Sequence, residues 1–258
     1  MTKSLTVERL FGWNAALFPS GHNGICKIKV GQRRDDRDGP MQIVSGSIGK
    51  EHIHFEAPSA RQIKTEMKAF LNWFKADSDI DLVLKAALAH LWFVTVHPFE
   101  DGNGRIARAI TDLALARSEN NPQRFYSMSA QIRLERNDYY NILERTQRDG
   151  MDVTAWLEWF LACLGRAIEG GQTALRAVLA KAKFWERMQQ TTINERQRLV
   201  LNKLLDGFQD KLTTSTYAKL TKSSHDTALR DIAYLSEKGF LLRSTEGGRS
   251  TSYVLTAE

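Results

Sequence analysis

The chain has 258 residues and a formal net charge of +6, and 42% of its residues are hydrophobic. This length suggests one large domain or two unequal ones, with the composition of an ordinary globular protein. No apolar run approaches the roughly 18 residues that a membrane-spanning helix needs. Cys26 and Cys163 give neither a disulfide framework nor a zinc-binding spacing. The sequence therefore predicts a reduced, cytoplasmic protein without a membrane segment. The charge alone does not indicate nucleic-acid binding, which requires a basic face.

The first 60 residues predict a helix, a loop and a hairpin. Thr6 is a plausible N-cap for the opening helix, which ends before Pro19. The stretch 31–40 is polar and turn-rich, with too few apolar side chains to bury, so it is expected to be a surface loop. The short runs 41–44 and 52–55 predict a β-hairpin with a loose, glycine-bearing tip.

The pattern then becomes helical. Ser59 is expected to cap one helix, and Ser78 or Asp79 to cap a second that runs from Ile80 to about Val96. The second helix is apolar on nearly every side and is predicted to be the buried centre of a bundle. Further helices are predicted at 105–117, around 131–148, at 153–168, and, after Gly170-Gly171, up to Met188.

The C-terminal part has its own pattern. Asn194 is expected to cap a first helix, residues 213–215 to open a short second one, and Ser224 to cap a third, which Gly239 is expected to end. Strands are predicted at 240–243 and 251–255. Three helices followed by a two-stranded wing are typical of a winged helix-turn-helix domain.

The residues that indicate chemistry are concentrated between His97 and Arg108. A buried helix delivers an imidazole at its end, and a short turn supplies the carboxylate of Asp101. The turn leads into a helix N-terminus, whose free amides and dipole favour an anion. Arg105 and Arg108 lie three residues apart and can leave the same helix face to bind phosphate oxygens. The segment predicts a phosphate site with a hard cation.

Other interpretations of nearby residues are weaker. Residues 102–107 also fit the dinucleotide-binding pattern G-x-G-x-x-G/A, but no strand precedes them and no βαβ unit surrounds them. The hairpin tip, residues 46–50, lacks the spacing of a P-loop. His90 lies among apolar neighbours and is expected to be a hydrogen-bonded core residue rather than a catalyst.

Residues 97–108 match every position of the Fic (filamentation induced by cAMP) motif, H-x-F-x-[D/E]-G-N-G-R-x-x-R. The chain also resembles this family in its opening helix, its hairpin and its C-terminal part. The resemblance implies a mainly α fold, a Fic-type helical bundle with a small β-hairpin flap at residues 41–55. It implies a Fic catalytic domain at 1–170, a helical linker at 171–190 and a winged helix-turn-helix domain at 191–258.

The resemblance also implies an activity, the transfer of AMP from ATP to a Ser, Thr or Tyr hydroxyl of a target protein, with auto-modification as a related outcome. His97 would then be the general base, and Asp101 would hold Mg²⁺. The flap would align the target by strand addition. The residues implied to contact the nucleotide are Val44, Ser45, Gly46, Ser47, Asp101, Gly102, Asn103, Gly104, Arg105, Ile106, Ala107, Arg108, Tyr139, Tyr140 and Gln147.

One departure from the family concerns regulation. Many relatives carry an inhibitory helix, [S/T]-x-x-x-E-[G/N], and the chain has no convincing copy, because Arg9 follows the spaced pair Ser4 and Glu8. Either the helix is missing or a partner protein supplies it. A homodimer is a further possible assembly of the chain. Two functional alternatives stay open: transfer of a different nucleotide or phosphate-containing group, and a DNA-binding regulator with an idle Fic core. In the second, His225, Thr227 and Arg230 would face a DNA groove.

Overall fold

The computed structural model describes residues 3–37, 39–45, 50, 52–77, 79–121, 123–148, 150–244 and 251–256. The chain divides into two compact units, Met1–Gln172 and Thr173–Glu258. Each unit has a hydrophobic core of its own. None of the described helices is both long enough and apolar enough to cross a membrane.

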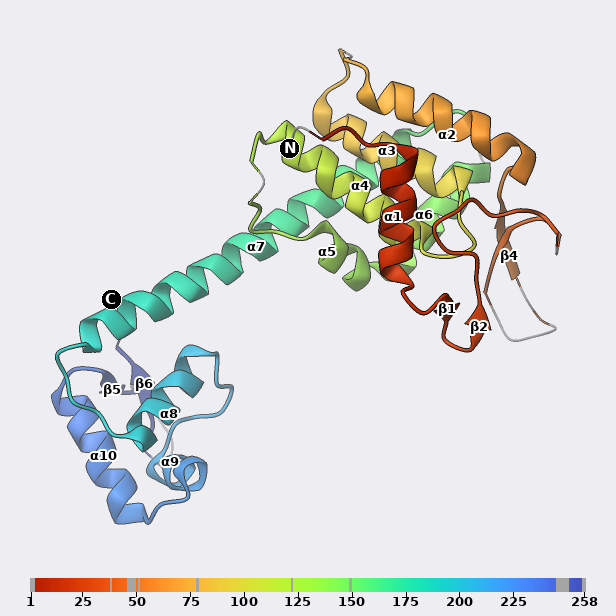
Figure 1. Cartoon of the computed structure of the whole chain (residues 1–258). Helices are drawn as coiled ribbons and strands as arrows, with labels where there is room; N and C mark the ends of the chain where they lie inside the picture. The colour runs from red at the N-terminus through yellow and green to blue at the C-terminus, as the bar shows by residue number, and fades with distance from the viewer. Residues whose placement is uncertain are drawn as a thin grey trace. The chain divides into compact units, whose positions relative to one another are not determined.

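The first unit is mainly helical, with two small antiparallel hairpins (Figure 1). The mainly helical fold class predicted from the sequence is confirmed. The elements of this unit are α1 (Val7–Leu17), β1 (His22–Asn23), β2 (Cys26–Lys27), β3 (Gln42–Ser45), β4 (His52–Glu56), α2 (Ala60–Lys75), α3 (Leu82–Val96), α4 (Asn103–Ser118), α5 (Met128–Leu134), α6 (Arg136–Arg148) and the first part of α7 (Thr154–Met188).

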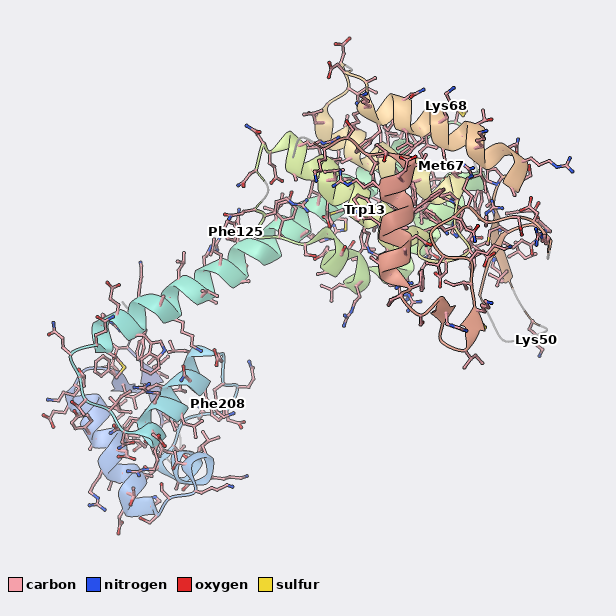
Figure 2. All side chains as sticks on the ribbon, viewed as in Figure 1. Trp13, Lys50, Met67, Lys68, Phe125 and Phe208 are labelled. Atoms are coloured by element: carbon pink, nitrogen blue, oxygen red, sulfur yellow. The ribbon has the colours of Figure 1, made fainter. Side chains whose placement is uncertain are left out.

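Helix α3 is the buried centre of this unit, as its apolar sequence predicts. It packs against α2 and α4 (Figure 1). Helix α2 presents Met67 to the core and Lys68 to its outer face (Figure 2). The cap of α3 differs from the expectation of Ser78 or Asp79. The carboxylate of Asp81 accepts hydrogen bonds from the amides of Val83 and Leu84 at 2.8 and 3.2 Å, and Ser78 lies outside the described residues.

The predicted hairpin is present as β3 and β4, which pair antiparallel with an irregularity between Ile43 and Val44. A second hairpin, β1–β2, has only two residues in each strand and was not evident from the sequence. It carries Cys26, which is exposed, whereas Cys163 is fully buried in α7. Both hairpins lie next to the segment between α3 and α4, as their side-chain contacts below show.

Three expectations need correction. The loop 31–40 is not wholly superficial, because Arg34 is only 3% exposed. The helix expected around 131–148 is two helices, separated at Glu135, which caps the C-terminus of α5. Gly170 and Gly171 do not interrupt a helix, since α7 continues through both. A Cβ atom on Gly171 would lie 2.3 Å from the carbonyl oxygen of Phe125, so glycine lets the two backbones approach (Figure 2).

The second unit contains the end of α7 and the elements α8 (Glu195–Leu205), α9 (Thr214–Thr221), α10 (His225–Glu237), β5 (Leu241–Arg243) and β6 (Tyr253–Leu255). These are the predicted three helices and hairpin. Asn194 and Ser224 cap α8 and α10 as predicted, and Thr213 caps α9, whose start was predicted within residues 213–215. The stretch expected to be a linker, 171–190, differs from that expectation. Phe184 and Met188 are buried in the core of the second unit, so this part of α7 belongs to it.

Candidate active site

His97 ends α3 in a left-handed backbone conformation, with φ of 49°. Its ring Nδ1 lies 3.1 Å from the carbonyl oxygen of Val94. Since a carbonyl can only accept, Nδ1 carries the proton and Nε2 keeps its lone pair. Burial lowers the pKa of His97 to about 4. The imidazole is therefore neutral at pH 7 and able to accept a proton.

The unusual conformation of His97 is supported by Arg34, which the sequence did not single out. The guanidinium donates from Nε to the carbonyl oxygen of His97 at 2.7 Å and from Nη2 to that of Pro58 at 2.6 Å. It also pairs with Asp36 at 2.8 Å. A second Asp36 oxygen accepts from the amide of Ala60, at the start of α2. The loop thus connects the hairpin, α2 and His97.

The turn after His97 is held by side chains from inside and outside it. Asn103 is 2% exposed and exchanges two hydrogen bonds with the backbone of Phe99, at 2.8 and 3.0 Å. Its amide group is used to shape the turn, so only its backbone can face a ligand. Asn14, fully buried on α1, donates to the carbonyl oxygen of Asp101 at 3.1 Å.

The carboxylate of Asp101 is one-third exposed, and its present partners compete only weakly with a cation for its oxygens. It accepts from Nδ2 of Asn23 at 2.5 Å and from the amide of Gly102, and the nearest guanidinium, that of Arg105, is 3.9 Å away. A carboxylate with neutral partners and access to solvent suits Mg²⁺, which is commonly held by one carboxylate together with substrate phosphates.

The backbone conformation at residue 102 requires glycine. Its φ is +86°, and a Cβ atom there would lie 2.9 Å from the ring of Phe18 and 3.3 Å from Leu17. The constraint at Gly104 is different. A Cβ atom there would meet only Arg108, at 3.6 Å, so the protein itself tolerates one, and the space beside it belongs to the cavity described below.

The N-terminus of α4 offers free amides beside this turn. The first amide of α4 with an intrahelical partner is that of Ile106, which donates to the carbonyl oxygen of Gly102 at 2.9 Å. The amides of residues 103–105 precede it and can bind an anion. Ile106 and Ala107 themselves are buried in the core. The structure therefore does not bring the side chains of these two predicted residues to the ligand-binding surface.

The two arginines of the motif face different surroundings. Arg105 lies over the ring of Phe18, with 4.5 Å between the guanidinium carbon and the ring centroid. Within the described residues, Arg108 forms no ion pair; Glu100, the nearest glutamate in sequence, pairs with Lys29 at 3.1 Å. Both arginines line a cavity of about 440 Å³ that also contains Arg133 and Arg136. This cavity has the charge to accommodate an anion.

A second cavity of about 590 Å³ brings His97 together with several of the predicted nucleotide-contacting residues. His97, Gly104 and Arg108 line it from the α3–α4 segment, and other walls come from the β3–β4 hairpin and from α6. The predicted nucleotide-contacting residues found in its lining are Val44, Gly104, Arg108, Tyr139, Tyr140 and Gln147. Gly46 and Ser47 lie outside the described residues, and Ser45 is placed only as the strand partner of His52.

A buried hydrogen-bond chain fixes the aromatic wall of this cavity. Thr111 donates to the carbonyl oxygen of Ala107 at 3.0 Å, so its oxygen accepts from Nδ1 of His90 at 2.9 Å. Nε2 of His90 then accepts from the hydroxyl of Tyr139 at 2.9 Å. Burial lowers the pKa of His90 to about 3 and raises that of Tyr139. His90 is the hydrogen-bonded core residue that the sequence predicted.

This combination of fold and site has counterparts among known proteins. Residues 4–115 match a family model described as Fic/DOC family. Residues 4–115 form a Fic domain. The protein adenylyltransferase fic-1 of Caenorhabditis elegans is 39% identical over 81 residues, which cover 30% of this chain and 16% of that protein. A uridine 5′-monophosphate transferase of Xanthomonas campestris pv. campestris is 30% identical over 126 residues, or 44% and 21% of the two chains.

A solved structure shares the fold of this chain. The crystal structure of a Fic family protein from Desulfovibrio desulfuricans G20 superposes with a TM-score of 0.53 at 18% identity. The match covers 98% of this chain and 69% of that one. The curated relatives above are much longer, since the present chain spans about a fifth of each. The solved structure thus shows the fold, while activity and substrate need arguments from this chain.

Proposed function

We propose that the chain is a protein adenylyltransferase that transfers AMP from ATP to a Ser, Thr or Tyr hydroxyl of a protein. The observation that carries the proposal is the placing of a neutral imidazole, that of His97, in the same 590 Å³ cavity as Arg108 and Gly104 at the start of α4. A base, a cation and free amides around one space suit attack of a hydroxyl on a phosphate.

In this reaction Nε2 of His97 takes the proton of the target hydroxyl, and the oxygen forms a bond to the α-phosphorus as the bond to pyrophosphate breaks. A pKa of about 4 is low for a base. Phosphates entering the cavity bring negative charge, which favours the protonated imidazole and raises its pKa toward the working pH. Nδ1 stays bound to the carbonyl oxygen of Val94, so the ring keeps its orientation.

The leaving pyrophosphate develops negative charge, which the chain can stabilise in two places. The first is the row of free amides at residues 103–105. The second is the pair Arg105 and Arg108, whose cavity also contains Arg133 and Arg136. Asp101 would hold Mg²⁺, which when bound neutralises phosphate charge.

The base of the nucleotide is expected against Tyr139, Tyr140 and Gln147. Tyr139 is fixed by His90, while Tyr140 is nearly half exposed and free to stack. The side chain of Gln147 donates to Thr95 at 3.0 Å. These contacts are mainly stacking and select weakly among bases. Transfer of UMP is therefore the second candidate, favoured by the match to a uridine 5′-monophosphate transferase.

The test is mass spectrometry of the purified chain after incubation with Mg²⁺ and either ATP or UTP. We expect a mass increase of one AMP on the chain or on an added target, and loss of this increase in His97→Ala by roughly 10²- to 10⁴-fold in rate. His22→Ala, an exposed histidine on β1, is the matched control. A mass increase with UTP alone would favour the second candidate. Full activity of His97→Ala would contradict both.

A further inference from the structure

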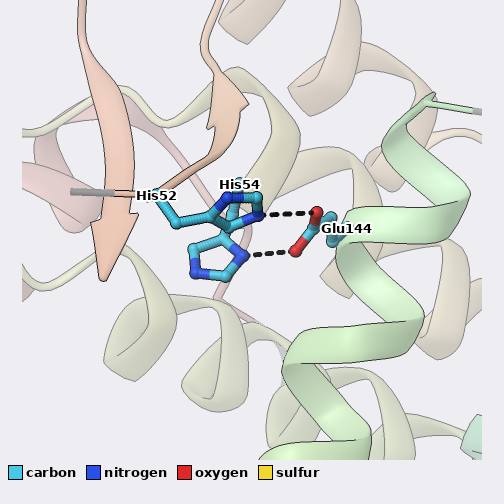
Figure 3. Close-up of side chains that lie close together, drawn as sticks. All are labelled: His52, His54 and Glu144. Carbon is cyan, nitrogen blue, oxygen red and sulfur yellow. Dashed lines mark hydrogen bonds and ion pairs between the residues drawn. The ribbon is translucent and has the colours of Figure 1, made fainter. Parts of the chain in front are cut away.

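Two histidines and a glutamate come together between the β3–β4 hairpin and α6, outside the residues used above (Figure 3). His52 and His54 are two residues apart on β4, so their side chains leave the same face of the strand. Glu144 on α6 faces both of them. Its Oε1 is 3.4 Å from Nε2 of His52, and its Oε2 is bonded to Nδ1 of His54.

We propose that His52, His54 and Glu144 form a site for a divalent transition metal ion, with Zn²⁺ as the best match. One nitrogen from each histidine and one carboxylate oxygen all lie within 4.8 Å of one another. Tetrahedral Zn²⁺, with ligands at about 2.0–2.2 Å, needs ligand atoms roughly 3.4 Å apart. Small rotations of side chains at a partly exposed site achieve this contraction. A ligand set of two imidazoles and one carboxylate also favours the binding of Zn²⁺ over that of Mg²⁺.

The carboxylate of Glu144 suits a metal. The hydrogen bond from His54 lowers the pKa of Glu144, so the carboxylate is ionised at neutral pH. An ion at this place would replace the hydrogen bonds that join the two imidazoles to the carboxylate. His52 is the most exposed ligand, which leaves the fourth position to water.

One residue opposes the ion. Nη1 of Arg148 lies 2.9 Å from Oε1 of Glu144, and its Nη2 donates to the carbonyl oxygen of Ile53 at 3.1 Å. A guanidinium at this distance competes for the carboxylate and repels a cation. Arg148 is more than half exposed, so it can swing into solvent when the metal binds. Replacing it should tighten metal binding, an effect that a purely structural cluster would not show.

The ion would affect the nearby cavity. His54 and Glu144 both line it, on the hairpin and on α6 respectively. A metal bond between them would fix the hairpin against α6 along the wall of the cavity. This site and its consequence do not depend on which group, if any, the chain transfers.

The experiment is a titration of the tag-free, full-length chain with Co²⁺, followed by visible absorption, and then with Zn²⁺ as competitor. We expect one equivalent to bind, with affinity at least tenfold weaker in His52→Ala, His54→Ala and Glu144→Gln. Arg148→Gln should bind severalfold more tightly. His22→Ala is the matched control and should bind the metal as the unaltered chain does. The ring of His22 contacts a carbonyl oxygen and lies on an exposed hairpin.

Hydrogen exchange supplies a readout independent of the spectrum. Zn²⁺ should slow exchange at the amides of 52–56 in the unaltered chain and not in Glu144→Gln, which keeps the shape of the side chain. Circular dichroism shows that each variant is folded. The proposal is overturned if no single saturable equivalent binds, or if binding survives undiminished in the folded His54→Ala and Glu144→Gln chains.

Discussion

Replacing Arg34 with Met should destabilise the first unit and alter His97 together. The guanidinium is fully buried, and the substitution keeps most of the volume of the side chain while removing its donors. The carbonyl oxygens of His97 and Pro58 would lose charge-assisted hydrogen bonds of 2.7 and 2.6 Å. At about 1.5–3 kcal/mol each, these two bonds suggest a loss of about 3–6 kcal/mol in the free energy of unfolding. Asp36 is 29% exposed, so water replaces its partner at little cost.

The assay is urea denaturation followed by tryptophan fluorescence, which reports mainly on the first unit because Trp185 is the one tryptophan of the second. A titration by nuclear magnetic resonance follows the ring of His97 in parallel. The positive charge of Arg34 contributes to the low pKa of His97, so this pKa should rise in Arg34→Met. In Arg34→Lys the charge stays but the forked geometry is lost. Stability should then fall while the pKa of His97 stays near its original value.

Arg33→Met is the matched control, since Arg33 is an exposed neighbour whose guanidinium carbon lies 6.0 Å from the ring centroid of Phe11. It should change the free energy of unfolding by less than about 1 kcal/mol. The reasoning would be refuted if Arg34→Met lost no more stability than Arg33→Met and left the pKa of His97 unchanged.

Three further predictions concern other parts of the chain. Arg108→Ala should weaken the binding of ATP more than that of AMP in calorimetric titrations, because AMP lacks the β- and γ-phosphates; equal losses would place Arg108 elsewhere. The free energy of unfolding should fall by up to about 1.4 kcal/mol per pH unit as the pH drops from 6.5 toward 3. In this range His90 is protonated in the unfolded chain but stays neutral in the folded chain, where its pKa is about 3. His90→Leu should show a correspondingly smaller slope in denaturation at pH 7 and pH 5, and an unchanged slope would contradict this origin. Gly171→Ala should lower the melting temperature, because its Cβ would overlap Phe125. Gly170→Ala has open space around its Cβ and should raise the melting temperature through helix propensity. Melting temperatures that shift in the same direction in both variants would be inconsistent with this packing.

The parts of the site that follow from local sequence could be predicted. The turn from His97 to Gly104 and the start of α4 are set by a helix end, a glycine with positive φ and a helix N-terminus, all within a dozen residues. Caps such as Thr6, Asn194 and Ser224 were found for the same reason, since a cap bonds to amides two or three positions away. The roles given to these residues rest on their resemblance to the Fic motif and belong to the proposed function.

The supports of the site could not be predicted, because they act across long separations in sequence. Arg34 lies in a polar loop and reads as a surface residue, yet it bonds to His97, 63 positions away. Asn14 likewise reads as a break in an apolar helix face, although it bonds to Asp101. For Asn14, the one available signal in the sequence was that a polar residue occupies a helix position that the apolar periodicity assigns to the core. Gly171 was misleading, because two glycines in a row usually mark a helix boundary.

The contrast between the two sulfhydryl groups makes the chain suitable for labelling without any engineered residue. Burial raises the pKa of Cys163 to about 12, so this thiol has almost no thiolate at neutral pH and does not react with maleimides. Cys26 is exposed on β2. A fluorophore attached there sits on the hairpin whose Asn23 touches Asp101. Its emission would follow events at the end of α3 in real time, from a single defined position.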